Sequence, residues 1–319
     1  MGSYTPEQVA RQAEMLANRV RKRFVHLKKR FDRERIEAFR LYDWDIPEVR
    51  AVVDWYAGHL VVAEYERTQT GPGWLEQMAA AVASALKVPD THVHLKRRTT
   101  GTARGPQYGR GRAPGPPLIV HERDLAFLVD LDGPLDTGLF CDHRETRRLV
   151  RERAHGAVFL NLFCYTGAFT CAAAAGGASE TVSVDRSATH LRRVRENLAL
   201  NGLDGPRHHL VRADVERFLD PGHSRDRRYT LAVVDPPSFS RSRDLRRAFD
   251  VTRDHPALLA RVLDRMAPGG TVIFSTNHRR FEPRFDGLRV ASFEEITART
   301  IPEDYAARPV HRAFLLIAS

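Results

Sequence analysis

The sequence predicts an α/β protein in which a seven-stranded, mostly parallel sheet follows a smaller α+β domain. Two observations carry this prediction. After Leu118, short apolar strands alternate with helical stretches, which is the pattern of a sheet covered by helices on both faces. The 319 residues, 42% of them hydrophobic, are enough to build two separate cores. We therefore expect one domain over residues 1–125 and a second over residues 126–319.

The N-terminal domain is predicted to begin with a long amphipathic helix. Between Glu7 and Phe31, apolar residues recur at helical spacing and share one face, while lysines and arginines occupy the other. Further along, β-branched and aromatic residues flank Ala57-Gly58, which predicts two strands joined by a turn. The predicted elements are a helix over residues 7–31, two strands within 51–66, a helix over 74–86 and a strand over 91–96.

The C-terminal domain is predicted to contain seven strands. They cover residues 158–163, 181–185, 208–211, 231–235, 271–275, 291–296 and 313–317. Helices are predicted over residues 168–175, 187–201, 215–219 and 257–266, the last of them ended by Pro268-Gly269-Gly270. In such a sheet, ligands bind beyond the carboxyl ends of the strands, so the residues that follow each strand are the candidates for chemistry.

Positive charge is concentrated in the N-terminal domain. The formal net charge is +10, and residues 19–35 and 96–112 together hold fifteen lysines and arginines against two acidic residues. Such a surface predicts a polyanionic partner, because each neutralised phosphate releases counterions. The Gly/Arg/Pro-rich loop over residues 99–117 adds one ring, Tyr108, that could stack on a splayed base. From charge alone, a solvated face without a partner and an anionic membrane surface stay open as alternatives.

The residues predicted to contact nucleic acid lie in three segments of the chain. They are Arg19, Arg21, Lys22, Arg23, Lys28 and Lys29, then Arg97, Arg98, Arg104, Tyr108, Arg110 and Arg112, and finally Arg241 and Arg243.

The sequence predicts neither a membrane segment nor an export signal. Polar residues interrupt its most apolar window, residues 157–175, and its N-terminus lacks a charged region followed by an apolar one. The three cysteines, Cys141, Cys164 and Cys171, are odd in number and lie in no metal-binding spacing. We expect a cytoplasmic protein with reduced thiols, no disulfide and no metal site.

The first two strands of the C-terminal domain predict a nucleoside site. Gly167 permits a tight turn after the first strand, and Asp185, at the end of the second, is placed to accept hydrogen bonds from two ribose hydroxyls. A nicotinamide cofactor would also require a G-x-G-x-x-G run for its pyrophosphate, whereas this turn offers a single glycine. S-adenosylmethionine has a nucleoside and no pyrophosphate and therefore fits better. A nicotinamide-dependent oxidoreductase is the alternative.

The run Asp235-Pro236-Pro237-Ser238-Phe239 ends the fourth predicted strand. Two consecutive prolines force a rigid extended turn, which leaves carbonyl oxygens directed into the site and the Phe239 ring beyond it. This arrangement suits a planar base: a carbonyl or the Asp235 carboxylate can accept from a base N–H, and the ring can stack on a flipped base. We predict Asp235, Pro236 and Phe239 as the catalytic, base-holding group, with Asn277 as a second polar contact.

Several segments resemble the RlmK-type 23S rRNA guanine methyltransferases, which form one half of a bifunctional enzyme. They are residues 135–144, 161–167, 235–240 and 248–255, and in the N-terminal domain residues 16–22, 40–43 and 51–57. The likeness covers nearly the whole chain. It implies a class I, Rossmann-like methyltransferase fold and S-adenosylmethionine-dependent methylation of guanine N7 in 23S rRNA.

The resemblance also implies which residues bind the cofactor. Asp136, Thr137, Phe140 and Arg144 would close over its methionine end, and the turn with Asn161, Phe163, Tyr165, Thr166 and Gly167 would surround its amino and carboxylate groups. Asp185 would hold the ribose, and Asp214 with Val215 the adenine. Arg186 and Asp235 complete the predicted cofactor-binding set.

The resemblance leaves other activities open. We expect a stand-alone form, in which a separate partner enzyme replaces the other half of the fused protein and the substrate is 23S rRNA or an assembling large subunit. Cytosine-C5 chemistry, which needs a thiolate nucleophile, is disfavoured because the segment Ser275-Thr276-Asn277 after the fifth strand carries no cysteine. Methylation of guanine N2 or another exocyclic amine is the first alternative, and a non-catalytic RNA-binding assembly factor the second.

Overall fold

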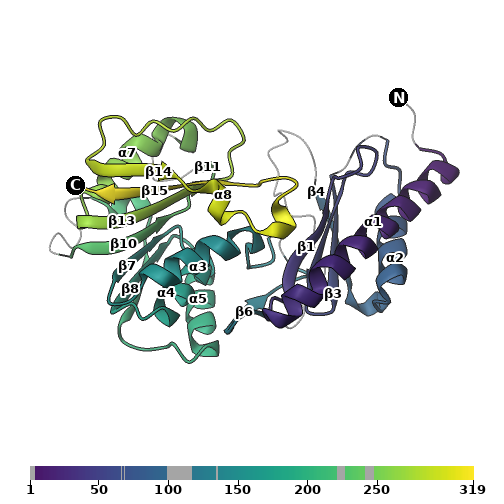
Figure 1. Ribbon diagram of the computed structural model, residues 1–319, viewed down its shortest axis with the longest axis horizontal. Coiled ribbons are helices and arrows are strands. Elements are labelled where there is room, and N and C mark those ends of the chain that lie inside the picture. The colour runs from purple at the N-terminus through teal and green to yellow at the C-terminus, as the bar shows by residue number, and fades with distance from the viewer. Residues whose placement is uncertain are drawn as a thin grey trace. The chain divides into compact units, whose positions relative to one another are not determined.

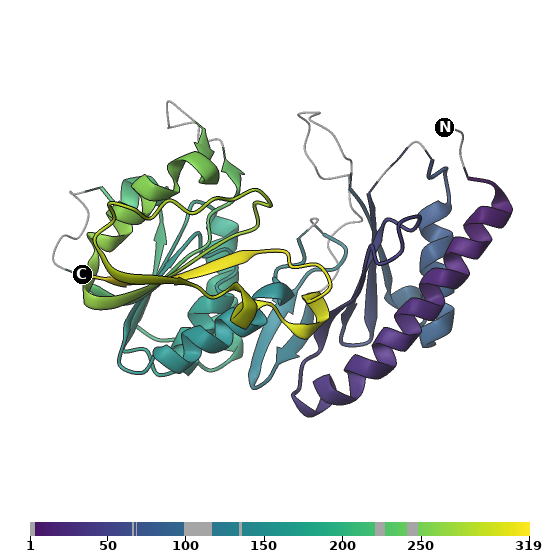
Figure 2. The ribbon, with the colours of Figure 1, turned by 45° about the horizontal axis from the view of Figure 1, so that its top comes forward.

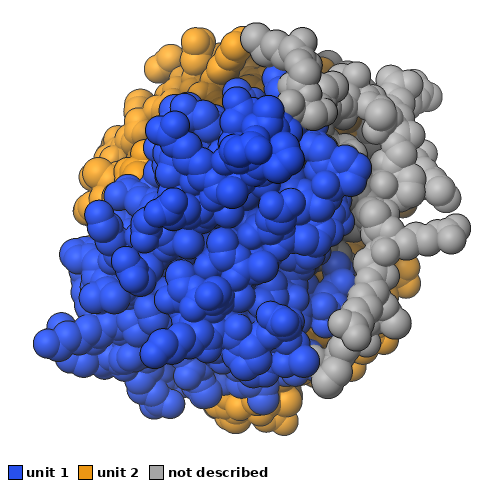
Figure 3. Space-filling view, turned by 90° about the vertical axis from the view of Figure 1, so that its right-hand side faces the viewer, with its two compact units in different colours: residues 1–141 blue, residues 142–319 orange. Residues whose placement is uncertain are grey.

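The computed structural model describes residues 4–65, 67, 69–98, 117–133, 136–220, 227–240 and 248–319. The chain divides into two compact units, residues 1–141 and 142–319, which Figure 3 shows in blue and orange. The boundary expected after residue 125 stays a prediction, and residues 126–141 group with the first unit. No helix among the described residues is both long enough and apolar enough to cross a membrane.

The first unit begins with the predicted amphipathic helix, α1 (Pro6–Arg33) (Figure 1). The side chain of Thr5 accepts from the N–H of Gln8, and the Gln8 side chain accepts from the N–H of Thr5, which forms a capping box. Leu16, Val20 and other apolar residues of one face are buried, as the spacing predicts. The opposite face carries the cations.

Helix α1 and α2 (Trp74–Leu86) accompany a four-stranded sheet in the order β1-β2-β3-β4. Its strands are β1 (Ala38–Asp43), β2 (Ala51–Tyr56), β3 (His59–Tyr65) and β4 (Val93–Arg98), and the 3₁₀ helix η1 (Asp90–His92) precedes β4. Ala57 and Gly58, both at positive φ, form the tight turn between β2 and β3. β1–β3 are antiparallel, whereas β4 is parallel to β3 because α2 crosses between them. A separate hairpin joins β5 (Leu118–Glu122) to β6 (Leu125–Val129).

The second unit contains the predicted seven-stranded sheet, ordered β14-β15-β13-β10-β7-β8-β9. Its strands are β7 (Val158–Leu162), β8 (Glu180–Asp185), β9 (His208–Arg212), β10 (Tyr229–Val234), β13 (Met266–Thr276), β14 (Val290–Glu295) and β15 (Arg312–Ala318). β7, β8, β9, β10 and β13 are parallel neighbours, while β15 is antiparallel to both β13 and β14. The prediction of seven strands in a mostly parallel sheet is therefore confirmed.

Helices cover both faces of this sheet (Figures 1 and 2). Alternate residues of β7 serve the two faces: Leu160 packs with Leu259 of α7, whereas Phe159 packs with Val150 of α3 and Ala173 of α4. The helices are α3 (Arg144–Arg153), α4 (Ala168–Ala175), α5 (Ala188–Leu200), α6 (Val215–Phe218), α7 (Val251–Leu263) and α8 (Thr297–Thr300), with the 3₁₀ helices η2 (Cys141–His143) and η3 (Glu303–Tyr305).

The prediction of a helix over residues 257–266 is wrong at both ends. Helix α7 begins at Val251, where the Asp250 side chain caps it, and contains Pro256 in its interior. Proline has no N–H to donate to the carbonyl of Thr252, one helical turn earlier. That carbonyl accepts from the Arg284 guanidinium instead, at 2.8 Å. The helix ends at Leu263, and residues 266–270 already belong to β13, which pairs irregularly there with β10.

Candidate active site

The turn after β7 has an unusual backbone. Phe163, Tyr165 and Gly167 have φ values of 56°, 48° and 78°, in the left-handed region that glycine alone adopts without cost. Hydrogen bonds hold this conformation: the N–H of Cys164 donates to the carbonyl of Val184 at 3.1 Å, and the N–H of Gly167 donates to the carbonyl of Cys164 at 2.8 Å. The turn therefore leaves the end of β7 in a fixed shape and leads directly into α4.

Asp185, at the end of β8, ties this turn to the next loop. Its Oδ2 accepts from the N–H of Tyr165 at 3.1 Å and its Oδ1 from the N–H of Ser187 at 2.8 Å, while His190 Nδ1 lies 3.2 Å from Oδ1. A carboxylate offers about four acceptor positions, so Oδ2 keeps capacity for a further donor such as a hydroxyl. The group is thus held rigidly and can still bind a ligand.

Gly167 packs so closely against α5 that there is no room for a side chain at this position. A Cβ here would lie 2.6 Å from Cγ1 of Val194 in α5, and the positive φ would be strained as well. We expect Gly167→Ala to lower the free energy of unfolding by about 2 to 4 kcal/mol. Urea unfolding would measure the loss. The matched control is Gly156→Ala, because Gly156 has a φ of +70° with open space around it. Equal losses in the two variants would contradict the packing argument.

Buried polar side chains support the turn from below. Asn161 Nδ2 donates to Thr170 Oγ1 at 2.9 Å, and Thr170 Oγ1 lies 2.7 Å from Ser183 Oγ. Asn197 Nδ2 of α5 donates to the carbonyl of Thr166 at 2.9 Å. Asn161 and Thr166 are buried, and the hydrogen bonds of the Asn161 side chain and the Thr166 carbonyl are made to other residues of the second unit. Their predicted cofactor contacts stay predictions.

The residues predicted to hold adenine lie at the start of α6. The Asp214 carboxylate caps this helix by accepting from the N–H of Glu216 at 3.0 Å, and Val215 beside it is buried. Arg186, which follows β8, places its guanidinium 3.9 Å from Asp214 Oδ2. A polar cap next to an apolar side chain is suited to the edge and face of a purine.

Asp235 follows β10, and its carboxylate meets two neighbours. Oδ1 accepts from Ser275 Oγ of β13 at 2.6 Å, and Oδ2 lies 3.5 Å from His143 Nε2. The predicted second contact, Asn277, accepts from Ser238 Oγ at 2.5 Å, which joins the turn after β10 to the end of β13. The carboxylate is therefore oriented from two sides.

The rest of this turn presents an aromatic ring. Pro236 is buried, and the chain continues into the short strand β11 (Phe239–Ser240), which pairs with β12 (Phe249–Asp250). Phe239 itself is 56% exposed. Its position two residues after the prolines suits a stacking platform for a base.

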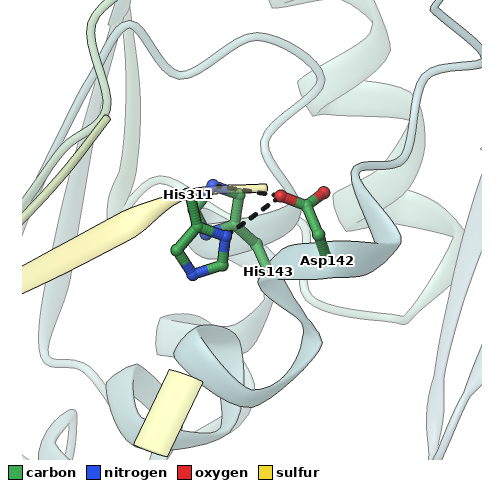
Figure 4. A group of neighbouring side chains, drawn as sticks. All are labelled: Asp142, His143 and His311. Carbon is green, nitrogen blue, oxygen red and sulfur yellow. Dashed lines mark hydrogen bonds and ion pairs between the residues drawn. The ribbon is translucent and has the colours of Figure 1, made fainter. Parts of the chain in front are cut away.

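Asp142, His143 and His311 form a cluster in which both histidines are buried (Figure 4). His143 Nε2 of this cluster is the atom that lies 3.5 Å from Asp235. His311 Nδ1 lies 3.1 Å from Asp142 Oδ2, and the two imidazole rings stack with centroids 4.2 Å apart and planes 13° from parallel. The three ligand atoms lie within 4.8 Å of one another, which is close enough for a metal site. However, a metal binds in the plane of an imidazole ring, so two stacked rings cannot share one ion without turning. The arrangement is instead that of two stacked histidines, of which His311 is hydrogen-bonded to Asp142.

Four more predicted cofactor residues come from residues 136–144. Asp136, Thr137 and Phe140 belong to the first unit, where Thr137 Oγ1 lies 3.0 Å from the Tyr56 hydroxyl, and their part in the site stays a prediction. Arg144 is buried in the second unit, where its guanidinium donates to Asp304. The structure gives this side chain a partner in the protein interior.

The residues predicted to bind nucleic acid differ in their surroundings. Arg19 pairs with Asp45, Lys28 with Asp32, and Arg97 with both Glu64 and Glu76. Of the predicted cations of α1, Arg19, Arg21, Lys22 and Lys29 are exposed, whereas Arg23 and Lys28 are partly buried. Of Arg98 the structure describes the backbone. Arg104, Tyr108, Arg110, Arg112, Arg241 and Arg243 lie outside the described residues.

All three cysteines of the chain are buried and reduced. Burial raises the pKa of the Cys164 thiol, and burial likewise raises the pKa of Cys171 to about 12. A neutral buried thiol is a poor nucleophile. This agrees with a reaction that uses no covalent cysteine intermediate.

Comparisons with known proteins identify the family. A model of the family described as "S-adenosylmethionine-dependent methyltransferase" matches residues 40–305. Ribosomal RNA large subunit methyltransferase K of Neisseria meningitidis is 39% identical over 305 residues, which cover 93% of this chain and 85% of that protein. Ribosomal RNA large subunit methyltransferase K/L of Chromohalobacter salexigens is 42% identical over 95% of this chain, but the chain spans 42% of its length.

A solved structure shares the fold. The SMU.776 protein, crystallised with S-adenosylhomocysteine, superposes with a TM-score of 0.75 at 23% identity, covering 95% of this chain and 82% of that one. At this identity the likeness speaks for the fold alone. Together with the length of the family match, these findings show that the chain belongs to the S-adenosylmethionine-dependent methyltransferases, in the family that includes ribosomal RNA large subunit methyltransferase K.

Proposed function

We propose that this chain transfers a methyl group from S-adenosylmethionine to N7 of a guanine in 23S rRNA, in the cytoplasm. The observation that carries the proposal is the turn after β10, where an oriented carboxylate and an exposed ring follow the same strand. Asp235 accepts a hydrogen bond from Ser275, and Phe239 is 56% exposed two residues after the prolines. The name of the Neisseria relative supports large-subunit rRNA as the substrate.

The chain's own residues fit the cofactor. A Cβ at Gly167 would collide with Val194, so glycine lets the turn after β7 pack closely on α5 and keep its tight left-handed shape at the end of the strand. Asp185 keeps acceptor capacity for ribose hydroxyls, and Asp214 and Val215 offer a polar and an apolar group for adenine. When bound, S-adenosylmethionine supplies an electrophilic methyl group on a sulfonium.

Guanine N7 carries a lone pair in the ring plane and no proton, so its methylation needs no general base. The protein's contribution is then to hold the base in line with the methyl group and to exclude water. Because the base gains positive charge, the Asp235 carboxylate stabilises the product side of the reaction. Phe239 fixes the plane of the base by stacking.

The exposed lysines of α1 are proposed to contact the RNA backbone. We expect the double substitution Lys22→Glu/Lys29→Glu to weaken RNA binding at least tenfold at low salt and to reduce the slope of log K against log salt by about 1.4 for two single-strand phosphate contacts. A filter-binding titration over a range of salt concentrations would measure both. The control is Arg289→Glu in the second unit, which changes an 86% exposed cation. Equal losses in control and variant would contradict the assignment.

The proposed function is tested by methyl transfer from labelled S-adenosylmethionine to unmodified 23S rRNA, followed by digestion and identification of the nucleoside. N7-methylguanosine made by the wild type and absent with Asp235→Ala supports the proposal. Another methylated nucleoside keeps the enzyme class and overturns the atom. Tight RNA binding without transfer favours a non-catalytic assembly role, or dependence on a separate partner enzyme.

One observation favours an exocyclic amine such as guanine N2 as the second candidate. Methylation of an amine releases a proton, and the Asp235 carboxylate, which Ser275 holds in place, offers an acceptor for that proton. N7 methylation has no use for such an acceptor. The nucleoside identified in the transfer experiment decides between the two atoms.

A further inference from the structure

The carboxylate of Asp235 is held on one side by a hydroxyl and faces a buried imidazole on the other. Ser275 Oγ donates to Oδ1 at 2.6 Å, whereas His143 Nε2 stands 3.5 Å from Oδ2. The same Nε2 lies 3.9 Å from Oδ2 of Asp142. A nitrogen lone pair directed at two carboxylates would be repelled by both, so we assign the proton of the neutral ring to Nε2. Nδ1, 3.3 Å from Thr146 Oγ1, is then the acceptor.

We propose that His143 is a positioning residue for Asp235: its Nε2–H aims the carboxylate at the base, and protonation of the ring in acid switches methyl transfer off. The proposal rests on the proposed function, because it deepens the role given to Asp235. The present separation of 3.5 Å is long for a hydrogen bond, and such contacts tighten when substrate binds.

The surroundings of His143 fix the direction of its titration. Four charged or titratable groups face it: Asp235 from the end of β10, Asp142 beside it in the chain, His311 stacked from the segment before β15, and Arg147 from α3. Burial lowers the pKa of His143 below its usual value; the two carboxylates oppose this shift, and His311 and Arg147 add to it. The ring is therefore neutral at neutral pH and becomes cationic only in acid.

The consequence for activity follows from charge. A neutral His143 leaves the negative charge of Asp235 available to the methylated base, which becomes cationic. An imidazolium at the same place would form an ion pair with Asp235 and cancel that charge. Activity should thus be full above the pKa of His143 and fall as the pH drops through it.

Two substitutions separate the hydrogen bond from the titration. His143→Phe keeps a ring to stack on His311 and removes the donor, so we expect kcat to fall about ten- to a hundredfold, with KM for S-adenosylmethionine changed less than threefold. His143→Gln restores a donor that does not titrate, so we expect it to recover most of kcat. Both variants should lose the acid limb of the kcat profile, which lies below the usual histidine pKa of 6.5 because burial lowers the pKa of His143.

The matched control is His255→Gln. His255 is also a buried histidine whose pKa is lowered by burial, but its ring bonds to the Val251 carbonyl and the Arg284 N–H, away from Asp235. Its acid limb should equal that of the wild type. Thermal unfolding and cofactor binding check that each variant is folded.

Three results would overturn the inference. The first is a wild-type kcat in both His143 variants, and the second is a kcat profile that keeps its acid limb in both. The third is an equal loss of that limb in His255→Gln. The readout is methyl transfer to any atom of the RNA, so methylation at another position would refute the N7 assignment while leaving the role of His143 measurable. Absence of any transfer by the wild type would overturn both the function and the inference.

Discussion

Asp235→Asn is expected to reduce kcat of methyl transfer by a factor of about 10² to 10³ while leaving the affinity for S-adenosylmethionine within a few-fold. The amide has the shape of the carboxylate and can still accept from Ser275 Oγ, so the turn after β10 keeps its geometry. What it loses is the negative charge that faces the cationic product. Removing one preorganised electrostatic partner of a transition state costs about 3 to 4 kcal/mol in other enzymes, which corresponds to this factor.

Single-turnover rates with saturating cofactor, together with calorimetric binding of S-adenosylmethionine, would separate the two effects of this substitution. A control is Asp264→Asn, which removes a carboxylate whose side chain is 63% exposed on the second unit. If the variant instead lost cofactor affinity in proportion to its rate, Asp235 would serve the cofactor alone and the base-holding role would be wrong.

Most of the second unit could be predicted from sequence because its elements are locally consistent. β7 is a short apolar run, β8 alternates valine with polar residues, and the alanine-rich stretch of α4 begins directly after Gly167. These signals need no knowledge of distant neighbours. The site followed from the same logic, since the residues after parallel strands must meet at one edge of the sheet.

The elements that escaped prediction depend on partners far along the chain. Helix α3 consists mainly of charged residues, and its buried Arg144 and Arg147 give no apolar periodicity. Pro256 reads as a helix boundary, yet the helix continues through it because Arg284 supplies the missing donor. β1, β5 and β6 in the first unit were also missed; β1 and β6 bury adjacent residues and show no clean alternation.

The same limit applies to the active site. Asp185 and Asp235 could be assigned from their positions after strands, whereas the role of Ser275 in orienting Asp235 depends on the pairing of β10 with β13. The stack of His143 on His311 joins residues 168 positions apart, and no local pattern announces it. Sequence reasoning therefore predicted groups that could meet ligands and missed the side chains that orient Asp235.

Arg144→Ala is expected to lower the free energy of unfolding by about 3 to 5 kcal/mol. The side chains of Arg144 and Asp304 are 1% and 0% exposed, and the guanidinium donates to the carboxylate. Truncating the arginine leaves a charge in the protein interior without its main partner, and this penalty exceeds what the pair contributes as a whole. Scanning calorimetry of the second unit's transition would measure the loss.

The double variant Arg144→Met/Asp304→Leu shows whether the cost comes from the orphaned charge. Because both charges are then replaced by apolar side chains of similar volume, most of the lost stability should return. Were Arg144 chiefly a ligand for the methionine end of the cofactor, as the resemblance implies, Arg144→Ala would weaken cofactor binding and leave the unfolding free energy nearly unchanged. A large loss of stability that the double variant restores would instead place Arg144 in the frame that supports the site.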